Sequence, residues 1–482
     1  MMNFDNRYAQ LPEQCYSKVE PTPVKAPKLI ALNQALAQEL GLDATWLSTS
    51  DGLAMLSGNT IADSSQPIAM AYAGHQFGQW VPQLGDGRAI LLGEVLDNMG
   101  RLMDIQLKGA GRTPYSRGGD GRNWVGPVLR EYLVSEAMAA LGVRTTRALA
   151  AVTTGDFVLR ENGPLPGAIL TRVASSHIRV GTFQYFAARD DQQALQALID
   201  HVIERHYPHI AENDNTALLL LENVIDAQAS LVAHWQSIGF IHGVMNTDNC
   251  TISGDTIDYG PCAFMDTYQS DKVFSSIDRG ARYAYQNQPR IAQWNLANFA
   301  QCLLPFMHED TEQAVALAQE AINRFDEHFI GHYLERMRAK LGLDDTRDDD
   351  LELISQLLQL MEEHQLDFTV SFTQLSYADA GSAFAAGGKL HDWHLRWQQR
   401  LGNDAQQIEK SRRKMQSINP VVIPRNHLIE AYIELAVKDN DYTAFNAMLD
   451  VVKCPYDTAH LQGIYTTPPT ADEVVSQTFC GT

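Results

Sequence analysis

The chain has 482 residues, of which 45% are hydrophobic and 20% charged, a balance typical of a soluble globular protein. This length allows two or three domains, or one large unit with two lobes. The formal net charge of −21 argues against a nucleic-acid-binding surface, which needs clustered lysines and arginines. No run of about 18 apolar residues occurs, so we expect no membrane span.

Targeting signals and cysteines narrow the class of protein further. The N-terminus lacks the apolar core of a secretory signal and the arginine-rich character of a transit peptide, so we expect a cytoplasmic location. The six cysteines include no Cys-x-x-Cys pair, and no histidine stands at zinc-ligand spacing, so a structural zinc site is not expected. Cys480, near the C-terminus, is the one cysteine whose position raises a functional question.

The N-terminal part of the chain divides into two predicted units. Residues 1–70 are interpreted as an extension that packs on the second unit, with one amphipathic stretch from Leu29 to Leu40. Residues 71–188 are predicted to form a small α+β lobe. Its strongest signal is a pair of apolar runs, ending at Leu96 and Lys108, on either side of an Asn/Gly turn, which predicts a β-hairpin.

A loop rich in glycine and arginine comes after this hairpin, from Gly109 to Arg122. The spacing of apolar residues then predicts a helix from about Pro127 to Leu141. Two β-rich stretches, 150–154 and 168–173, complete the lobe.

The C-terminal part is predicted to be mainly helical, with a core unit at 189–308 and a C-terminal region at 309–482. Amphipathic patterns predict helices at 194–207, 216–238 and 312–338, the last with Asp310 as N-cap. Residues 251–258 are interpreted as a compact hairpin, and the acidic run 344–352 as a solvated loop.

The most informative motif is His242-Gly-Val-Met-Asn-Thr-Asp-Asn249, followed by Asp258-Tyr-Gly. Protein kinases have H-R-D-x-x-x-x-N and then D-F-G, where the Asn and the second Asp hold Mg²⁺ against the nucleotide phosphates. Asn249 and Asp258 take those two places. Val244, however, takes the place of the catalytic Asp and cannot accept a proton. The motif therefore predicts a metal clamp without the usual base.

Further kinase features precede this motif in the expected order. Gly85 and Gly87 precede the first strand of the hairpin, and Lys108 ends the second, where a kinase has its nucleotide-binding lysine. Glu131 lies near the start of the next helix, where a kinase has the ion-pair partner of that lysine. Each residue alone is a weak signal, but their order makes coincidence improbable.

Several arginines have no kinase counterpart. Arg112, Arg117 and Arg122 lie on the glycine-rich loop, and Arg172 and Arg179 flank a short polar segment. Glycine lets a backbone approach phosphate closely, and guanidinium groups match phosphate oxygens. The added charge predicts that the nucleotide is held differently from that of a kinase.

The motif leaves one candidate for the proton acceptor. We interpret His242 as a structural anchor of its loop. Asp248, beside the predicted metal ligand Asn249, is the remaining candidate. A divalent ion nearby would lower the pKa of Asp248, which would keep it ionised but make it a weak base.

Six segments together resemble the selenoprotein O family, whose members are pseudokinases that act as protein adenylyltransferases. The resemblance covers essentially the whole chain. The segments are Ala73–Gln79 (AGHQFGQ), Gln83–Ala89 (QLGDGRA), Gln106–Arg117 (QLKGAGRTPYSR), Arg130–Leu133 (REYL), His242–Asn249 (HGVMNTDN) and Asp258–Pro261 (DYGP).

This resemblance implies an activity, ligands and site residues. ATP would bind turned around relative to a kinase, and AMP would pass to Ser, Thr or Tyr hydroxyls of proteins with release of pyrophosphate. UTP is an alternative donor, and Mg²⁺ or Mn²⁺ the implied cofactor. Asn249 and Asp258 would be metal ligands, Asp248 the proton acceptor and Glu131 the partner of Lys108. The implied nucleotide contacts are Gly85, Gly87, Arg88, Lys108, Asp120, Gly121, Arg172, Arg179 and Asp258.

The family also has a redox-active residue near its C-terminus, and Cys480 occupies that place. In some bacterial members it pairs with a cysteine of the activation segment. The corresponding segment here, Asp271–Asp278, has no cysteine, and Cys262 is the nearest candidate.

We therefore predict an α+β, bilobal, protein-kinase-like fold with a mainly helical C-terminal lobe and N- and C-terminal extensions. The predicted function is transfer of AMP to protein hydroxyls, without nucleic-acid or membrane partners. Two alternatives stay open, a protein kinase with a displaced base and a non-catalytic nucleotide-binding scaffold. The intact set of Lys108, Glu131, Asn249 and Asp258 argues against the scaffold. The protein substrates and the oligomeric state do not follow from the sequence.

Overall fold

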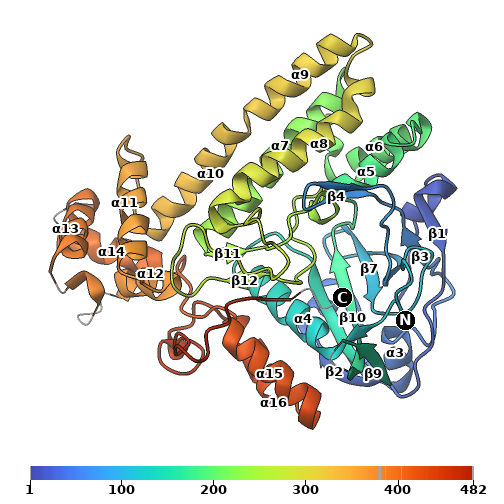
Figure 1. The fold of residues 1–482 in the computed structure, drawn as a ribbon, viewed down its shortest axis with the longest axis horizontal. Helices are drawn as coiled ribbons and strands as arrows, with labels where there is room; N and C mark the ends of the chain where they lie inside the picture. The colour runs from blue at the N-terminus through green and yellow to red at the C-terminus, as the bar shows by residue number, and fades with distance from the viewer. Residues whose placement is uncertain (1, 162, 378–381, 386, 403, 480–482) are drawn as a thin grey trace.

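A computed structural model describes residues 2–161, 163–377, 382–385, 387–402 and 404–479. It contains an antiparallel β-sheet and a large set of helices, so the predicted α+β class is confirmed. In Figure 1 the sheet occupies one end of the molecule, and most helices extend away from it.

The main sheet is antiparallel and draws strands from the first 174 residues. Its central hairpin is β6 (Ala89–Leu96) and β7 (Leu102–Lys108), in a register that pairs Ala89 with Lys108. The predicted hairpin is thus confirmed. The strand order is β1 (Tyr16–Lys18), β3 (Ile68–Met70), β6, β7, β10 (Gly163–Ala174), β9 (Arg147–Arg160) and β2 (Lys28–Leu32), with β8 (Asn123–Trp124) paired to β10.

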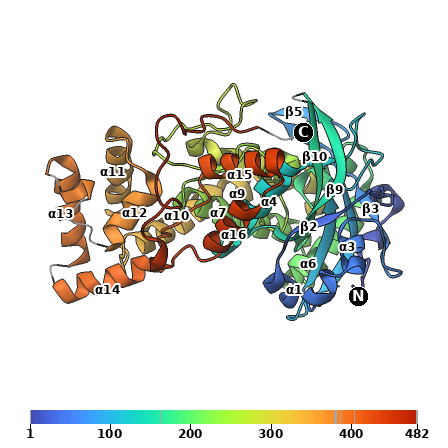
Figure 2. The same cartoon turned by 90° about the horizontal axis from the view of Figure 1, so that it is seen from below.

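Helix α4 (Val125–Ala140) connects the sheet to the rest of the molecule. One side packs on β9 and β10, and the other contacts α15 (Asn426–Asp439) and α16 (Thr443–Val452). Figure 2 shows these two C-terminal helices beside α4. Because α4 is enclosed on both sides, its apolar residues are not confined to one stripe. The polar residues that it carries, Glu131 among them, are held in fixed positions.

Long helices form the central part of the molecule. Helix α7 (Thr216–Ser237) packs against α8 (Gln288–Met307) and α10 (Phe325–Lys340), and α5 (Val180–Ala187) packs on α8. A separate hydrophobic cluster lies farther from the sheet and is built largely by four helices (Figure 1). These are α11 (Asp350–Glu363), α12 (Phe368–Tyr377), α13 (Lys389–Leu401) and α14 (Ala405–Gln416).

Two further helices are α6 (Gln192–His206) and α9 (Thr311–Asn323). The remaining elements of the described residues are short, namely α1 (Gln34–Glu39), α2 (Ala44–Leu47), α3 (Ser50–Leu56), β4 (Gly74–Gln76), β5 (Gln79–Val81), β11 (Phe240–Ile241), β12 (Ala263–Phe264) and seven 3-10 helices.

The amphipathic stretch Leu29–Leu40 is not a single element, because its first residues pair with β9 as strand β2 and the rest form α1. Three local predictions were wrong in detail. The predicted helix 312–338 is interrupted at Arg324, which separates α9 from α10. Asp310 does cap α9, accepting hydrogen bonds from two backbone N–H groups.

Residues 251–258 are not a hairpin. Thr251 bridges to Arg179, and Thr256 bridges to Thr145, so the two ends of this segment pair with other parts of the chain. The acidic run is also more than a solvated loop. Asp350 is fully buried and forms salt bridges with Arg338 and Arg400, since a buried charge requires such partners.

Among the described helices, α7 has the length and composition that crossing a membrane would require. However, 56% of its most apolar window is buried inside the protein, and it packs between α8 and α10. A central helix of a hydrophobic core has the same composition, so this finding is weak evidence for a membrane span.

Candidate active site

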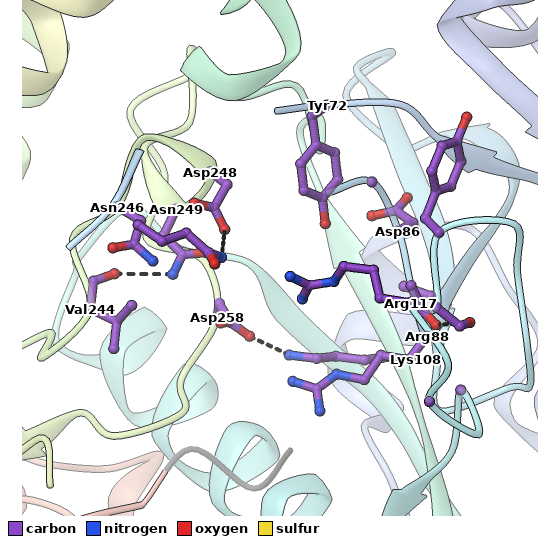
Figure 3. Close-up of a pocket in the computed structure, with 18 of the residues that line it drawn as sticks. Tyr72, Asp86, Arg88, Lys108, Arg117, Val244, Asn246, Asp248, Asn249 and Asp258 are labelled. Carbon is purple, nitrogen blue, oxygen red and sulfur yellow. Dashed lines mark hydrogen bonds and ion pairs between the residues drawn. The ribbon is translucent and has the colours of Figure 1, made fainter. Parts of the chain in front are cut away.

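A cavity of about 600 Å³ lies between the sheet and the helical part of the molecule. Figure 3 shows its two walls, with Lys108 and Arg88 on the sheet side and Asn249 and Asp258 on the opposite side. Every residue that the family resemblance assigns to the nucleotide, the metal or the proton transfer lines this cavity. They are Gly85, Gly87, Arg88, Lys108, Asp120, Gly121, Arg172, Arg179, Asp248, Asn249 and Asp258. The structure thus brings these residues together, while their individual roles stay predictions.

A buried cluster of charges joins the two walls. The Lys108 ammonium group lies 2.5 Å from a carboxylate oxygen of Glu131 and 2.5 Å from one of Asp258. Glu131 reaches Lys108 from α4, and Asp258 reaches it from the opposite wall. The predicted ion pair between Lys108 and Glu131 is therefore present.

Behind this cluster, Arg172 is already occupied by protein partners. Its guanidinium group donates to Glu131 at 3.1 Å and to the side-chain oxygen of Gln106 at 2.5 Å. Gln106 in turn donates to Asp86 at 3.1 Å. Arg172 therefore fixes Glu131 on the back wall of the cavity, in addition to any contact with a nucleotide.

The loop after α7 is held by His242, as predicted. His242 is buried, stacks on Trp235 at 5.4 Å between ring centroids, and its Nε2 lies 2.9 Å from the carbonyl oxygen of Ile257. This bond links the loop of Asn249 to that of Asp258. The Asn249 amide donates to the carbonyl oxygen of Val244 at 3.0 Å. His242 thus sets the separation of the two predicted metal ligands.

Asp258 has an unusual backbone and stays ionised. Its φ of 68° lies in the left-handed region, which Asp and Asn adopt more readily than most residues. Burial alone would raise the pKa of its carboxyl group, but the charges of Lys108 and Arg88 hold that pKa well below its usual range. A permanent negative charge therefore faces the cavity.

Asp248 has the opposite electrostatic character. Burial raises the pKa of its carboxyl group to about 6, and the charge of Arg179 only partly offsets this effect. From the sequence, we expected a bound divalent ion to lower this pKa. The protein's own groups act in the opposite direction. One oxygen accepts a hydrogen bond from Gln76 at 3.2 Å, and the other has no hydrogen-bond partner among the described residues. A carboxylate with a raised pKa is a stronger base.

The oxygen donors of this wall fit a hard divalent cation. Among the described residues, no group of three or more His, Cys, Asp or Glu side chains could hold a metal ion. Mg²⁺ does not require such a group, since it is commonly bound by one or two carboxylates together with substrate phosphates and waters. Asp258 supplies an ionised carboxylate, Asn249 an amide oxygen, and Asp248 a free oxygen nearby. These residues suit Mg²⁺ or Mn²⁺.

The glycines of the strand-preceding loop are required by packing. Gly85 has a φ of +76°, and a side chain there would come within 2.3 Å of the Tyr115 ring. The Tyr115 loop therefore closes directly onto the Gly85 backbone. This contact folds the Gly/Arg-rich loop over the cavity, where Gly87 also lies.

The arginines of that loop do not act alike. Arg112 donates to the carbonyl oxygens of Gly119 and Gly118 and does not line the cavity. Its guanidinium group therefore braces its own loop in this structure, and a contact of Arg112 with phosphate stays a prediction. Arg117 lines the cavity and points into it in Figure 3. Arg122 also lines it but donates to backbone carbonyls of the N-terminal segment.

Arg179 is placed to bind an anion. It is the N-cap residue of α5, its guanidinium group lies 4.3 Å from the centre of the Tyr72 ring, and one nitrogen donates to the carbonyl oxygen of Asp248 at 3.0 Å. Its second terminal nitrogen is buried without a hydrogen-bond partner among the described residues. Buried donors are normally satisfied, so a ligand phosphate is the natural partner.

Sequence reasoning missed several residues of the site. Arg160 lines the cavity from the end of β9 and donates to Asp120 at 2.8 Å. No sequence signal pointed to it, since the long β9–β10 hairpin brings it there. Gln76 lay within a recognised segment but was given no role. Leu159 and Ile277 also line the cavity.

The predicted redox pair is only partly described. Cys262 is a free, fully buried thiol, and burial raises its pKa to about 12, which disfavours the reactive thiolate. Cys480 lies outside the described residues. The tail nevertheless docks nearby. Thr478 donates from its hydroxyl to the carbonyl oxygen of Pro261 at 2.5 Å and from its N–H to that of Phe274 at 2.7 Å.

Taken together, the cavity has a buried Lys–Glu–Asp cluster, arginines with unsatisfied donors and hard oxygen ligands. This is the site of an enzyme that acts on a nucleoside triphosphate. Comparison with known proteins identifies the family. The family model described as "Protein adenylyltransferase SelO" matches residues 1–453. The chain belongs to the SelO family, and the predicted resemblance is confirmed.

Curated relatives agree with this result. A protein of Rhizobium rhizogenes strain K84 named "Protein nucleotidyltransferase YdiU" is 55% identical, over 99% of this chain and 97% of the relative. The protein of the same name from Rhodopseudomonas palustris strain BisB18 is 56% identical, and that from Geobacillus kaustophilus 53%, each over 99% of both chains. The chain is therefore a nucleotidyltransferase.

Proposed function

We propose that this protein transfers AMP from ATP to Ser, Thr or Tyr hydroxyls of other proteins, with UTP as an alternative donor. One observation carries the proposal. The cavity keeps the Lys108–Glu131–Asp258 cluster and Asn249, yet it has Val244 where a kinase has its base, and Arg117 and Arg179 face it as additional cations. The same correspondences support a kinase-like bilobal fold, with the cavity between the lobes.

In the proposed reaction, the acceptor hydroxyl oxygen attacks the α-phosphorus of ATP. A bond forms between the two atoms, the bond from the α-phosphorus to the bridging oxygen of the β-phosphate breaks, and pyrophosphate leaves. Asp248, with its free oxygen, accepts the proton of the hydroxyl. The arginines and Lys108 balance the charge of the phosphates. A bound Mg²⁺ or Mn²⁺, held by Asn249 and Asp258, would neutralise further phosphate charge.

Isotope labelling tests the transferred group. Incubation with ATP labelled at the α-phosphate should label protein, while label at the γ-phosphate should appear in pyrophosphate. Gel autoradiography and chromatography of the small products measure the two. Transfer of the γ-label to protein would show a kinase with a displaced base instead. Tight nucleotide binding without transfer of either label would show the non-catalytic scaffold.

We further propose that Cys480 forms a reversible disulfide with Cys262. Thr478 bonds to the residue before Cys262, which supports the proximity, whereas the burial and raised pKa of Cys262 oppose rapid exchange. In the cytoplasm, where thiols are kept reduced, the bond would form only under oxidative stress.

Reductant should then raise the activity of oxidised enzyme, and Cys480→Ser should make it indifferent to reductant. The matched control is Cys454→Ser, which alters an exposed free thiol and should leave the response unchanged. Mass spectrometry that finds both Cys262 and Cys480 as free thiols after oxidation would disprove the pairing.

A further inference from the structure

Large apolar side chains gather at the mouth of the active-site cavity. Over all the described residues, seven large apolar side chains are more than half exposed. Two of them, Leu159 (77% exposed) and Ile277 (57%), line the cavity. Phe157 (72%) stands two residues before Leu159 on β9, and Phe479 (69%) follows Thr478, which pairs with Ser275 near Ile277. We call these four the acceptor rim. Exposed apolar groups that cluster, rather than scatter, mark an interaction surface.

Two residues of the rim line the cavity itself from different parts of the chain. Leu159 comes from β9, and its neighbour Arg160 is fixed by a salt bridge to Asp120 at 2.8 Å. Ile277 precedes Asp278, whose carboxylate accepts hydrogen bonds from the N–H groups of Arg282 and Tyr283. Local bonds of the neighbouring residues therefore fix the backbone that carries each of these two side chains.

The other two residues extend the rim outward. Phe157 is exposed on the same face of β9 as Leu159, because the strand alternates and Val158 between them is buried. Phe479 comes directly after Thr478, which is paired with Ser275 and Ser276 just before Ile277. The C-terminal tail thus adds an aromatic side chain beside the segment that carries Ile277.

We propose that the acceptor rim binds a protein segment in which large apolar side chains flank the acceptor hydroxyl. The acceptor must enter through this mouth to reach the phosphates, so its neighbouring residues meet the rim. The phosphate-binding wall of the cavity is polar and cationic, and it leaves the apolar rim to another ligand. Burial of apolar neighbours of the acceptor against the rim would stabilise the complex. The enzyme would therefore prefer such segments over segments in which small or charged residues flank the acceptor.

This inference rests on the proposed transfer of AMP to protein, and the experiment separates the two. The substrates are two sets of short synthetic peptides, each with one Ser, Thr or Tyr. In one set Leu and Phe stand next to this acceptor, and in the other set Gly stands there. The wild-type enzyme with α-labelled ATP should prefer the apolar flanks in kcat/KM. Leu159→Ser and Ile277→Ser should each lower kcat/KM for the apolar-flanked peptide by about tenfold. The rate with Gly-flanked peptides and the Kd for ATP should change little.

Two matched controls exist in the β6–β7 hairpin, at the end of β6 and on the turn that follows it. Met99 is 77% exposed, as Leu159 is, and Leu96 is 57% exposed, as Ile277 is. Neither lines the active-site cavity. Met99→Ser and Leu96→Ser should therefore keep the wild-type preference, which separates the effect of position from that of lost surface hydrophobicity.

Each other result overturns the inference. Wild-type preference in the rim variants would show that the rim does not contact the acceptor. A loss of ATP affinity as large as the loss of kcat/KM would show that Leu159 and Ile277 contact the nucleotide. A changed sedimentation coefficient in the variants would make the rim a surface for self-association. Absence of any α-label on peptide with the wild-type enzyme would refute the proposed function itself, and the rim with it.

Discussion

Asp258→Asn should reduce nucleotidyl transfer by about 10³-fold or more. Stabilisation of phosphate charge by a bound cation is worth several kcal/mol, and about 4 kcal/mol corresponds to this factor. The substitution removes the ionised carboxylate that faces the cavity. It keeps a side chain of the same shape, and Asn tolerates the left-handed backbone of this position (φ 68°). Asn is therefore a cleaner test than Ala.

The variant should remain folded, because Lys108 keeps its second partner, Glu131. The expected signature is loss of the metal-dependent part of ATP affinity in calorimetry, together with the loss of rate. Asp97→Asn is a matched control. Asp97 is paired with a basic residue, Arg101, as Asp258 is with Lys108, but it lies on the β6–β7 turn away from the cavity, and Asp97→Asn should keep the rate. Undiminished activity of Asp258→Asn would mean that the metal site is misplaced.

Asp248→Asn should lower kcat by about 10²-fold, the lower end of the 10²–10⁴-fold range that is usual for loss of a general base. The loss is smaller than that expected for Asp258, since proton transfer to water remains open. KM for ATP should change little, because the variant keeps the shape of the side chain and its neighbour Arg179 bonds to the backbone of residue 248.

Gln76→Ala provides the comparison for this prediction. Gln76 donates the hydrogen bond that orients the Asp248 carboxylate, so its loss should slow transfer less than Asp248→Asn does. Pre-steady-state measurement of pyrophosphate release distinguishes a slowed chemical step from slowed product release. A wild-type chemical rate in Asp248→Asn would exclude this carboxylate as the proton acceptor and favour water in that role.

The sequence determined the parts of the site that depend on short-range order. The motif from His242 to Asn249, the Asp258 motif and Lys108 at the end of a hairpin strand are local patterns, and the structure places all of them at one cavity. The α+β class and the central hairpin also follow from local periodicity. Long, regularly spaced apolar segments bounded by turn residues are the sequence patterns that predict secondary structure best.

The tertiary structure decided what depends on contacts between distant segments. Lys28–Leu32, at the start of the amphipathic stretch, form strand β2 because they pair with the edge of β9. Asp350, in an acidic run, is buried because Arg338 and Arg400 converge on it.

The same holds within the site. The pKa of Asp248 rises because other segments bury it, Arg112 turns to its own loop, and the acceptor rim joins β9, the segment at Ile277 and the C-terminal tail. Sequence motifs record which side chains are present and how the nearby backbone runs. Burial, charge balance and the shape of a surface arise only when segments far apart in the chain pack together.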